Sequence, residues 1–431
     1  MKSIWNETEK TEFSELQGHI NTDVLIVGGG MSGILCAYML KKAGVDCVLV
    51  EADRILSGIT NATTAKITFQ HGLIYHKTIQ KYGKEKAQLY YESQKDALDM
   101  LVKIAAKTQA EVEMCSSFVY SIGNRAVIEK EVEALDTIGC NAEFCTDTEL
   151  PFEVAGAVKV ENQAKFHPLK FGYGIAKKLK IYEKTKVLEF KSGTAITERG
   201  SVNAKTVIVA THFPFINKHG WYFLKMYQHR SYVVALENAQ TFRDMYVDEN
   251  QSGLSFRNYG DVLLLGGGSH RTGKDGGNWE ELRRFAQRYY PNSRETGHWA
   301  TQDCMTLDSL PYIGRYSKLT DNLYVATGYN KWGMTSSMVS AMILSDFVCR
   351  GESKYEKVYS PSRTIIHPQL AVNVFESAKG LITPGKPRCP HLGCVLKYNK
   401  QEHSWDCSCH GSRFDKDGEI IDNPATKGME D

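Results

Sequence analysis

A glycine-rich turn near the N-terminus constrains the fold of this chain more than any other feature. The turn, GGGMSG at residues 28–33, follows an apolar run at 23–27 and opens a helix-like stretch that ends near Gly44. A second apolar run, CVLV, occupies residues 47–50. Strand, turn, helix and strand in this order form the first half of a parallel dinucleotide-binding sheet, so we expect an α/β domain.

The residue types of this turn suit a dinucleotide. Gly28 permits the tight turn, Gly30 lets the backbone approach a pyrophosphate, and Gly33 lets helix and strand pack closely. Glu51 ends the second run 18 positions beyond Gly33, where a carboxylate favours the unphosphorylated ribose of FAD or NAD over NADP. The alternative is a glycine turn that binds no ligand. The expected cofactor-binding residues are Gly28, Gly30, Met31, Ser32, Gly33 and Glu51.

A second pattern lies near the C-terminus, where Cys389 and His391 are followed, after fifteen residues, by Cys407 and His410. Two thiolates can hold one iron and two imidazoles the other, which is the asymmetric ligation of a Rieske [2Fe–2S] centre. A Cys2His2 zinc site is the alternative, but zinc ligands within a pair are usually separated by two or more residues. We therefore expect these four residues to bind a [2Fe–2S] cluster.

Length and composition limit the remaining possibilities. A chain of 431 residues exceeds what one hydrophobic core usually organises, so we expect two or three domains. Its 52 basic and 50 acidic residues leave a formal charge of +2, which gives no reason to expect nucleic acid as a partner. No apolar run approaches the roughly 20 residues of a membrane helix, and residues 1–18 lack the features of a secretory signal. We expect a cytoplasmic protein without a membrane span.

Three further segments carry a resemblance to a known family. They are a loop rich in small hydroxyl residues at 57–66, the sequence ATH at 210–212 behind an apolar run, and GYNKWGMT at 328–335 before the last long helix. With the glycine turn, they make roughly residues 23–351 resemble the FAD-dependent oxidoreductases of the D-amino-acid-oxidase and glycine-oxidase superfamily. The resemblance implies that the third segment is a second glycine turn pointing at the flavin ring. It also implies that residues 184–187 belong to a strand that touches adenine.

The cofactor expected from this resemblance is FAD. Members that tether FAD covalently use a cysteine or histidine near the flavin, and residues 328–335 contain neither, so we expect non-covalent FAD. The further cofactor-binding residues that the resemblance implies are Thr64, Lys66, Val187, Gly328, Trp332, Gly333 and Met334.

The cluster motif also resembles a known group. CPHLGC and CSCHGSRF are similar to the Rieske proteins of cytochrome bc complexes because of the additional cysteines Cys394 and Cys409. The resemblance implies a disulfide between these two cysteines and a hydrogen bond from Ser412 to a bridging sulfide. Phe414 departs from the pattern, since those proteins keep a tyrosine that bonds a ligand sulfur. We therefore expect a reduction potential lower within the Rieske range.

These observations predict an α/β fold, with a Rossmann-type FAD domain and a mixed α+β substrate domain, followed by a small all-β Rieske cluster module. Only about 28 residues separate Pro361 from Cys389, so the cluster module should be abbreviated. The expected boundaries are 20–75, 160–215 and 305–351 for the FAD-binding domain, 76–159 and 216–304 for the substrate domain, 352–387 for a linker and 388–431 for the cluster module.

The resemblance implies a flavin-dependent oxidoreductase that acts on a small amine, amino acid or related substrate, with one-electron transfer between FAD and the cluster. Its partner would be a one-electron carrier protein or a quinone-like acceptor, and the sequence leaves the direction of electron flow open. One alternative is an oxygen-using oxidase with a structural cluster; another is a redox sensor or electron-transfer protein without enzymatic activity.

The candidate catalytic residues come from segments near the expected flavin. Lys331 and His71 lie in or just after the flavin-facing loops, and Arg257 could clamp a carboxylate with its fork of donors. For His71 and Lys331 the alternative is a satisfied polar side chain in a loop. For Arg257 it is an exposed arginine in a hairpin.

Overall fold

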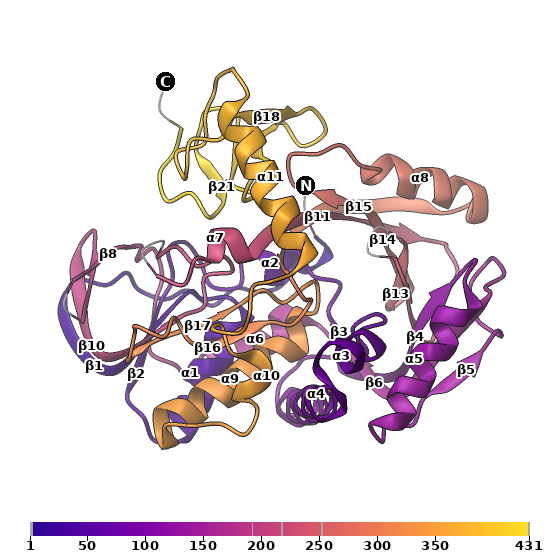
Figure 1. The fold of residues 1–431 in the computed structure, drawn as a ribbon, viewed down its shortest axis with the longest axis horizontal. Helices are drawn as coiled ribbons and strands as arrows, with labels where there is room; N and C mark the ends of the chain where they lie inside the picture. The colour runs from indigo at the N-terminus through magenta and orange to yellow at the C-terminus, as the bar shows by residue number, and fades with distance from the viewer. Residues whose placement is uncertain (1–2, 192, 217–218, 251–252, 430–431) are drawn as a thin grey trace.

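The computed structural model describes residues 3–191, 193–216, 219–250 and 253–429. In these ranges the strands form one sheet of eight strands, one of nine and one of four. Figure 1 shows the four-stranded sheet, from the C-terminal part of the chain, above the other two. An α/β fold followed by a small all-β module is thus confirmed.

The first glycine turn follows β1 of the eight-stranded sheet. β1 (Gly18–Val27) pairs in parallel with β2 (Cys47–Val50) and with β10 (Gly200–Val209), and its last four residues are all buried. α1 (Met31–Lys42) starts at the turn, and α9 (Gly333–Arg350) packs against it. The other strands are β7 (Ile181–Tyr182), β8 (Val187–Lys191), β9 (Thr194–Thr197), β16 (Tyr312–Arg315) and β17 (Leu323–Thr327).

The nine-stranded sheet is mixed, because β12 pairs in parallel with β4 while the other neighbours are antiparallel. β3 and part of β6 come from stretches that the sequence assigned to the FAD-binding domain, so the chain crosses between the two sheets there. In spatial order the strands are β15 (Arg294–Thr306), β11 (Met226–Glu237), β14 (Val262–Arg271), β13 (Ser255–Tyr259), β12 (Met245–Asp248), β4 (Glu113–Ser121), β6 (Gly156–Lys165) and β3 (Lys66–Ile67), with β5 (Glu143–Cys145) beside β6.

The helix α4 (Lys84–Ala105) connects the two large sheets by packing against α9. Its buried residues, among them Tyr90, Ala97 and Leu101, recur at helical spacing and form the packed face. No helix in the described ranges is both long enough and apolar enough to cross a membrane. The remaining helices are η1 (Ile4–Glu7), α2 (Ile59–Ala62), α3 (Tyr75–Tyr82), α5 (Arg125–Thr137), α6 (Pro168–Ala176), α7 (Tyr222–Lys225), α8 (Asn278–Tyr289) and α10 (Glu356–Tyr359).

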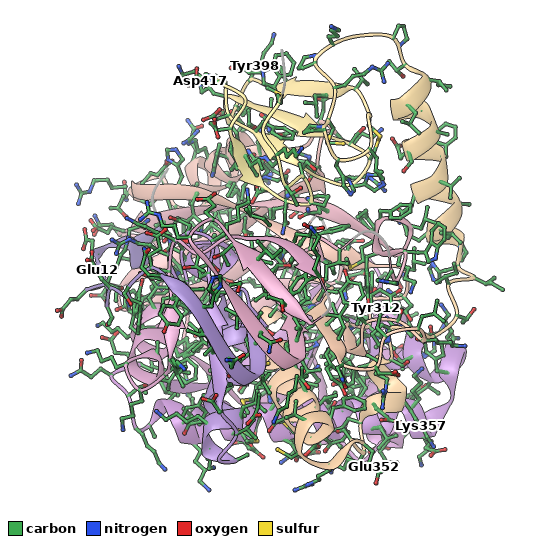
Figure 2. The ribbon with its side chains drawn as sticks, turned by 90° about the vertical axis from the view of Figure 1, so that its left-hand side faces the viewer. Glu12, Tyr312, Glu352, Lys357, Tyr398 and Asp417 are labelled. Atoms are coloured by element: carbon green, nitrogen blue, oxygen red, sulfur yellow. A yellow bond between two sulfur atoms is a disulfide. The ribbon has the colours of Figure 1, made fainter. Side chains whose placement is uncertain are left out.

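The C-terminal module stands above the body of the protein, where Figure 2 marks it with Tyr398 and Asp417. α11 (Pro368–Ile382) lies beside it and comes from the segment expected to be a linker. Pro368 occupies the first turn of α11, where its missing N–H removes no helical hydrogen bond. The strands of the module are β18 (Leu396–Asn399), β19 (Ser404–Cys407), β20 (Arg413–Phe414) and β21 (Ile420–Asp422).

Candidate functional site

The glycines of the first turn meet different surroundings. A Cβ on Gly28 would lie 2.5 Å from the carbonyl oxygen of Ala210, and a Cβ on Gly33 would collide with the carbonyl oxygen of Gly28. A Cβ on Gly30 would have only the hydroxyl of Thr60 within 4 Å, at 3.8 Å. Gly28 and Gly33 therefore allow close packing, while Gly30 leaves open space at the start of α1, where a pyrophosphate fits.

Glu51 is held in place by backbone N–H groups. Its carboxylate accepts hydrogen bonds from the N–H of Gly29 at 2.6 Å and from that of Asp53 at 2.9 Å. Burial raises the pKa of Glu51, and these two hydrogen bonds oppose the rise. The side chain is therefore fixed beside the turn, in the position expected of a group that meets a ribose.

A cavity of about 1410 Å³ lies between the eight-stranded and nine-stranded sheets and extends to the C-terminal module. It exceeds the roughly 300–1,000 Å³ of a drug-sized ligand site, so a dinucleotide and a small substrate fit together. Of the residues expected at the FAD and substrate sites, Gly33 and Arg257 do not line it. Those that do are Gly28, Gly30, Met31, Ser32, Glu51, Thr64, Lys66, His71, Val187, Gly328, Lys331, Trp332, Gly333 and Met334.

Arg257 supports the scaffold instead. Its side chain is 1% exposed, and its guanidinium donates to the carbonyl oxygens of Thr64, Ala65 and Phe166, the last two at 3.1 Å. These contacts occupy donors that a carboxylate clamp would need, so we assign Arg257 to holding this loop rather than to substrate. The same loop presents Lys66 to the cavity, where burial, followed by the charge of Arg257, lowers the pKa of Lys66 to about 7.

His71 lines the cavity but has both ring nitrogens engaged. Nδ1 lies 2.6 Å from the hydroxyl of Tyr90, and Nε2 lies 2.8 Å from the carbonyl oxygen of Thr68. The ring stacks on Trp332, with centroids 4.9 Å apart. Because burial lowers the pKa of His71 to about 3, the imidazole is neutral near pH 7. We therefore expect His71 to hold Trp332 in position rather than to transfer a proton.

Lys331 ends a turn of unusual backbone conformation. Asn330 and Lys331 have left-handed φ angles of +51° and +74°, and the side-chain amide of Asn330 donates to the carbonyl oxygen of Gly328 at 2.6 Å. Nζ of Lys331 donates to the hydroxyl of Ser269 at 3.2 Å, on the nine-stranded sheet. Burial lowers the pKa of Lys331 to about 8, against the charge of Asp303. Near neutral pH the cavity therefore holds an ammonium group that readily loses its charge.

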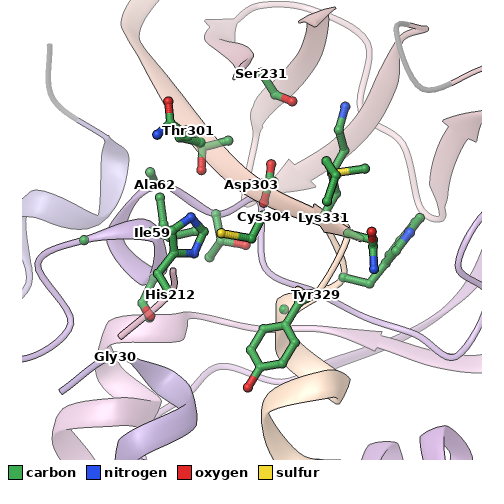
Figure 3. Close-up of a pocket in the computed structure, with 18 of the residues that line it drawn as sticks. Gly30, Ile59, Ala62, His212, Ser231, Thr301, Asp303, Cys304, Tyr329 and Lys331 are labelled. Carbon is green, nitrogen blue, oxygen red and sulfur yellow. The ribbon is translucent and has the colours of Figure 1, made fainter. Parts of the chain in front are cut away.

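The sequence interpretation missed the polar residues that the nine-stranded sheet presents to this cavity. Thr301 and Asp303 lie on β15, and Ser231 of β11 lies opposite Thr301. Figure 3 shows these three residues with Lys331 in one part of the cavity, away from Gly30. Burial raises the pKa of Asp303, and the charge of Lys331 opposes the rise. The sequence carries no alternation that marks this wall, because Thr301, Gln302 and Asp303 are all polar.

The two cluster loops converge in the C-terminal module. Cys389 and Cys407 are buried with their thiols in hydrogen-bond contact, and the rings of His391 and His410 lie 5.0 Å apart. The backbone N–H of His391 is directed at the sulfur of Cys389, and that of His410 at the sulfur of Cys407. N–H groups of this kind stabilise cluster-bound thiolates, so the donor set fits a [2Fe–2S] cluster.

Cys394 and Cys409 form the disulfide that the resemblance implied. Gly380 of α11 packs directly on this bond, because a Cβ there would collide with the sulfur of Cys409. The hydroxyl of Ser412 is in hydrogen-bond contact with Cys389. The segment expected to be a linker thus forms part of the wall around the cluster loops.

The second cluster loop is docked on strands of the nine-stranded sheet. Gln302 of β15 donates to the carbonyl oxygen of Gly411 at 2.8 Å. Gln228 of β11 donates to the carbonyl oxygen of Asn423 at 2.6 Å, and Asn423 donates to that of Thr211 at 2.7 Å. These bonds bring the end of β10, strands β11 and β15 of the nine-stranded sheet and the C-terminal module together at one place.

A buried charge network lies beside this contact. Glu402 of the module accepts hydrogen bonds from Nε of Arg230 at 3.1 Å, from Arg413 at 2.8 Å and from the hydroxyl of Tyr232 at 2.9 Å. The side chains of Glu402, Arg230 and Arg413 are all at most 4% exposed. Because a buried charge that loses its partner is costly, this network favours one docked position of the module.

The chain matches two protein families in succession. Residues 23–347 match the family described as FAD dependent oxidoreductase, and residues 352–430 match the Rieske [2Fe-2S] domain. The first match covers most of the two large sheets, and the second includes α11 together with the four-stranded sheet.

One relative aligns with nearly the whole of this chain, and others align with about four fifths of it. YhfW of Bacillus subtilis (strain 168), an iron-sulfur protein named for a Rieske 2Fe-2S centre, is 34% identical over an alignment that covers 99% of this chain and 97% of YhfW. Gamma-glutamylputrescine oxidoreductase of Escherichia coli (strain K12) is 23% identical, over 79% of this chain and 87% of that protein. The crystal structure of glycine oxidase from Geobacillus kaustophilus superposes with a TM-score of 0.68 at 18% identity, over 80% of this chain and 99% of the oxidase.

Proposed function

This chain belongs to the FAD dependent oxidoreductase family and ends in a Rieske [2Fe-2S] domain, and from this premise we propose that it oxidises a small amino acid or related amine and delivers the electrons singly through the cluster. Its cofactors are FAD and a [2Fe–2S] cluster. When bound, FAD supplies hydride removal from a carbon beside nitrogen, and the cluster supplies one-electron transfer.

The chain offers two helix N-termini to the FAD. Gly30 and Met31 at the start of α1, and Gly333 and Met334 at the start of α9, all line the cavity. A helix N-terminus favours negative charge, so we assign α1 to the pyrophosphate and α9 to the flavin ring. Glu51 then meets the ribose and Val187 the adenine. With no cysteine or histidine in the second turn, the FAD is held non-covalently.

The cluster is assigned to four residues of the C-terminal module. Cys389 and Cys407 hold one iron as thiolates, and His391 and His410 hold the other as neutral imidazoles. Burial lowers the pKa of His391 to about 4 and that of His410 to about 3, so neutral rings suit this surrounding.

The substrate class follows from the charges on one wall of the cavity. Asp303 and Lys331 present opposite charges to the part that Figure 3 shows together with Ser231. A carboxylate accepts hydrogen bonds from a substrate ammonium group, and a lysine donates to a substrate carboxylate. The hydroxyl of Thr301 has no hydrogen-bond partner among the described residues and offers one more polar contact. This arrangement supports a small zwitterionic amino acid over a simple amine.

The observation that carries the proposal is the position of β15. Thr301, Gln302 and Asp303 all line the cavity, and Gln302 also donates to the carbonyl oxygen of Gly411 in the second cluster loop. One strand therefore touches both the expected substrate and the cluster module. A one-electron carrier protein or a quinone-like acceptor would take electrons from the cluster.

An anaerobic titration tests the proposal. The purified holoprotein is mixed with a panel of small amino acids and amines, while flavin absorbance and the EPR signal of the reduced cluster are recorded. We expect at least one amino acid to bleach the flavin and to produce the cluster signal. Turnover with oxygen while the cluster stays oxidised would favour an oxidase with a structural cluster. Failure of every substrate to bleach the flavin would favour a redox sensor.

A further inference from the structure

Arg271, in the nine-stranded sheet, donates hydrogen bonds to a loop of the cluster module. It is the last residue of β14, and its guanidinium donates to the carbonyl oxygen of Ser408 at 3.1 Å and to that of Cys409 at 3.0 Å. Ser408 and Cys409 are the two residues between Cys407 and His410, one proposed ligand of each iron. The guanidinium therefore reaches the cluster loop from outside the Rieske domain, which matches only residues 352–430.

The surroundings of Arg271 keep its charge in place. A third donor binds the side-chain oxygen of Asn373 at 2.9 Å, and the guanidinium lies 4.9 Å from the ring centroid of Tyr227. Glu376 is the acidic residue that acts on it most strongly, and that carboxylate is paired with Lys274 at 2.6 Å. Arginine stays protonated in proteins. A fixed positive charge consequently lies beside the loop, and the acidic residue that acts on it most strongly is already paired with a lysine.

We propose that Arg271 is a positioning residue that raises the reduction potential of the cluster and makes that potential depend on the docked position of the module. Reduction adds one negative charge to the cluster, and a fixed positive charge in a partly buried place stabilises the reduced form. Phe414 stands where a tyrosine donor is found in the resembled proteins, and the charge of Arg271, rather than a hydrogen bond to a ligand sulfur, offsets part of that loss. The inference rests on the cluster assignment of the proposed function and not on its substrate.

Ser269 and His270 directly precede Arg271 in β14, and Ser269 lines the cavity. Ser269 accepts a hydrogen bond from Lys331 at 3.2 Å, and Nε2 of His270 lies 2.9 Å from the hydroxyl of Tyr232, which donates to Glu402. Arg271 follows directly. A short stretch of one strand thus joins the charged wall of the cavity, the buried network of the module and the cluster loop.

A redox titration of the full-length holoprotein, followed by EPR and needing no substrate, tests the inference. For Arg271→Gln we expect a cluster potential lowered enough to change the one-electron equilibrium about tenfold, which corresponds to 59 mV, while the flavin potential stays unchanged. Arg271→Lys keeps the charge and should lose less than half as much. A Rieske-type spectrum in both variants shows that the cluster is intact. An unchanged potential in Arg271→Gln with an intact cluster overturns the inference.

A second variant decides the matter if Arg271→Gln assembles no cluster. Asn373→Asp places a carboxylate against the guanidinium without touching its bonds to Ser408 and Cys409, so the field of Arg271 is neutralised and the potential should fall. Gln369→Glu adds the same charge one helical turn away, and Gln369 bonds Asn373 rather than Arg271. A larger fall in Asn373→Asp than in Gln369→Glu supports the inference, and equal or absent shifts overturn it. If no amine reduces the flavin, the cluster potentials can still be measured, so failure of the proposed function is distinguished from failure of this inference.

Discussion

Glu402 of the C-terminal module accepts a hydrogen bond at 3.1 Å from Nε of Arg230, a residue of strand β11 in the nine-stranded sheet. The side chain of Glu402 is 1% exposed and that of Arg230 is 4% exposed. Water therefore does not screen the pair, and the contact ties the module to the wall of the substrate cavity. The module should keep one position during turnover.

The first prediction concerns this contact. Glu402→Gln removes a buried negative charge that two arginines share, and breaking such a pair typically costs about 3–5 kcal/mol. We expect a lower free energy of unfolding by denaturant and faster proteolysis between residues 352 and 387. Asp275→Asn is the matched control, because Asp275 and Lys397 form an exposed pair across the same boundary at 2.8 Å, and exposed pairs contribute little. Equal effects of the two substitutions would contradict the docking account.

The second prediction concerns the nucleotide turn. Gly30→Val fills the open space at the start of α1, so the purified protein should contain less than a tenth of the wild-type FAD while the cluster still assembles. Gly123→Val is the control, since a Cβ on Gly123 would also meet no close contact, with nothing within 4 Å, but Gly123 lies outside the cavity. Stoichiometric FAD in the Gly30→Val protein would remove the basis of the site.

The third prediction concerns Lys331 and pH. Burial lowers its pKa to about 8, so the ammonium is charged below pH 8 and neutral above it. Affinity for a carboxylic acid without an amino group should be highest below pH 8 and should fall as the pH rises through about 8. Lys331→Gln should bind about tenfold more weakly at pH 7 and show no such inflection. Flavin absorbance changes report the binding, and the same inflection in Lys331→Gln would assign the titration to another group.

The fourth prediction concerns the histidine ligands. His391→Cys replaces a neutral imidazole by a thiolate, which adds negative charge and should lower the cluster potential and change its EPR spectrum. The FAD content should stay at the wild-type level. The exposed His403 serves as a control, and His403→Cys should leave both properties unchanged. A wild-type spectrum in His391→Cys would show that the ligand is misassigned.

The local motifs could be predicted from sequence because their chemistry depends on near neighbours. Gly33 is required by a backbone contact with Gly28 within one strand–turn–helix unit, and the proposed cluster ligands Cys389 and His391 are separated by one residue. The segment 352–387, which contains Pro368, was expected to be a linker, yet it includes α11. A proline can end a helix or occupy its first turn, and here it begins α11.

The charged wall of the cavity could not be predicted because it forms between distant segments. The charge of Lys331, which lies in a different loop, acts on the buried carboxylate of Asp303. Arg257 is buried because its guanidinium donates to carbonyl oxygens of two segments that are distant in sequence. The polar residues at the start of β11 also depend on a distant segment. Gln228 and Arg230 are polar because they face the cluster module, so the apolar alternation of a half-buried strand is absent there.

The central claim is that electrons from a substrate pass within one molecule from the flavin to the cluster. Rapid mixing with a reducing amino acid from the panel, without oxygen, measures this directly when absorbance follows the flavin and freeze-quenched EPR follows the cluster. We predict that flavin absorbance falls first and that the cluster signal then rises at a rate independent of protein concentration. A cluster that stays oxidised beside fully reduced flavin, or one whose reduction rate increases with protein concentration, would contradict the account.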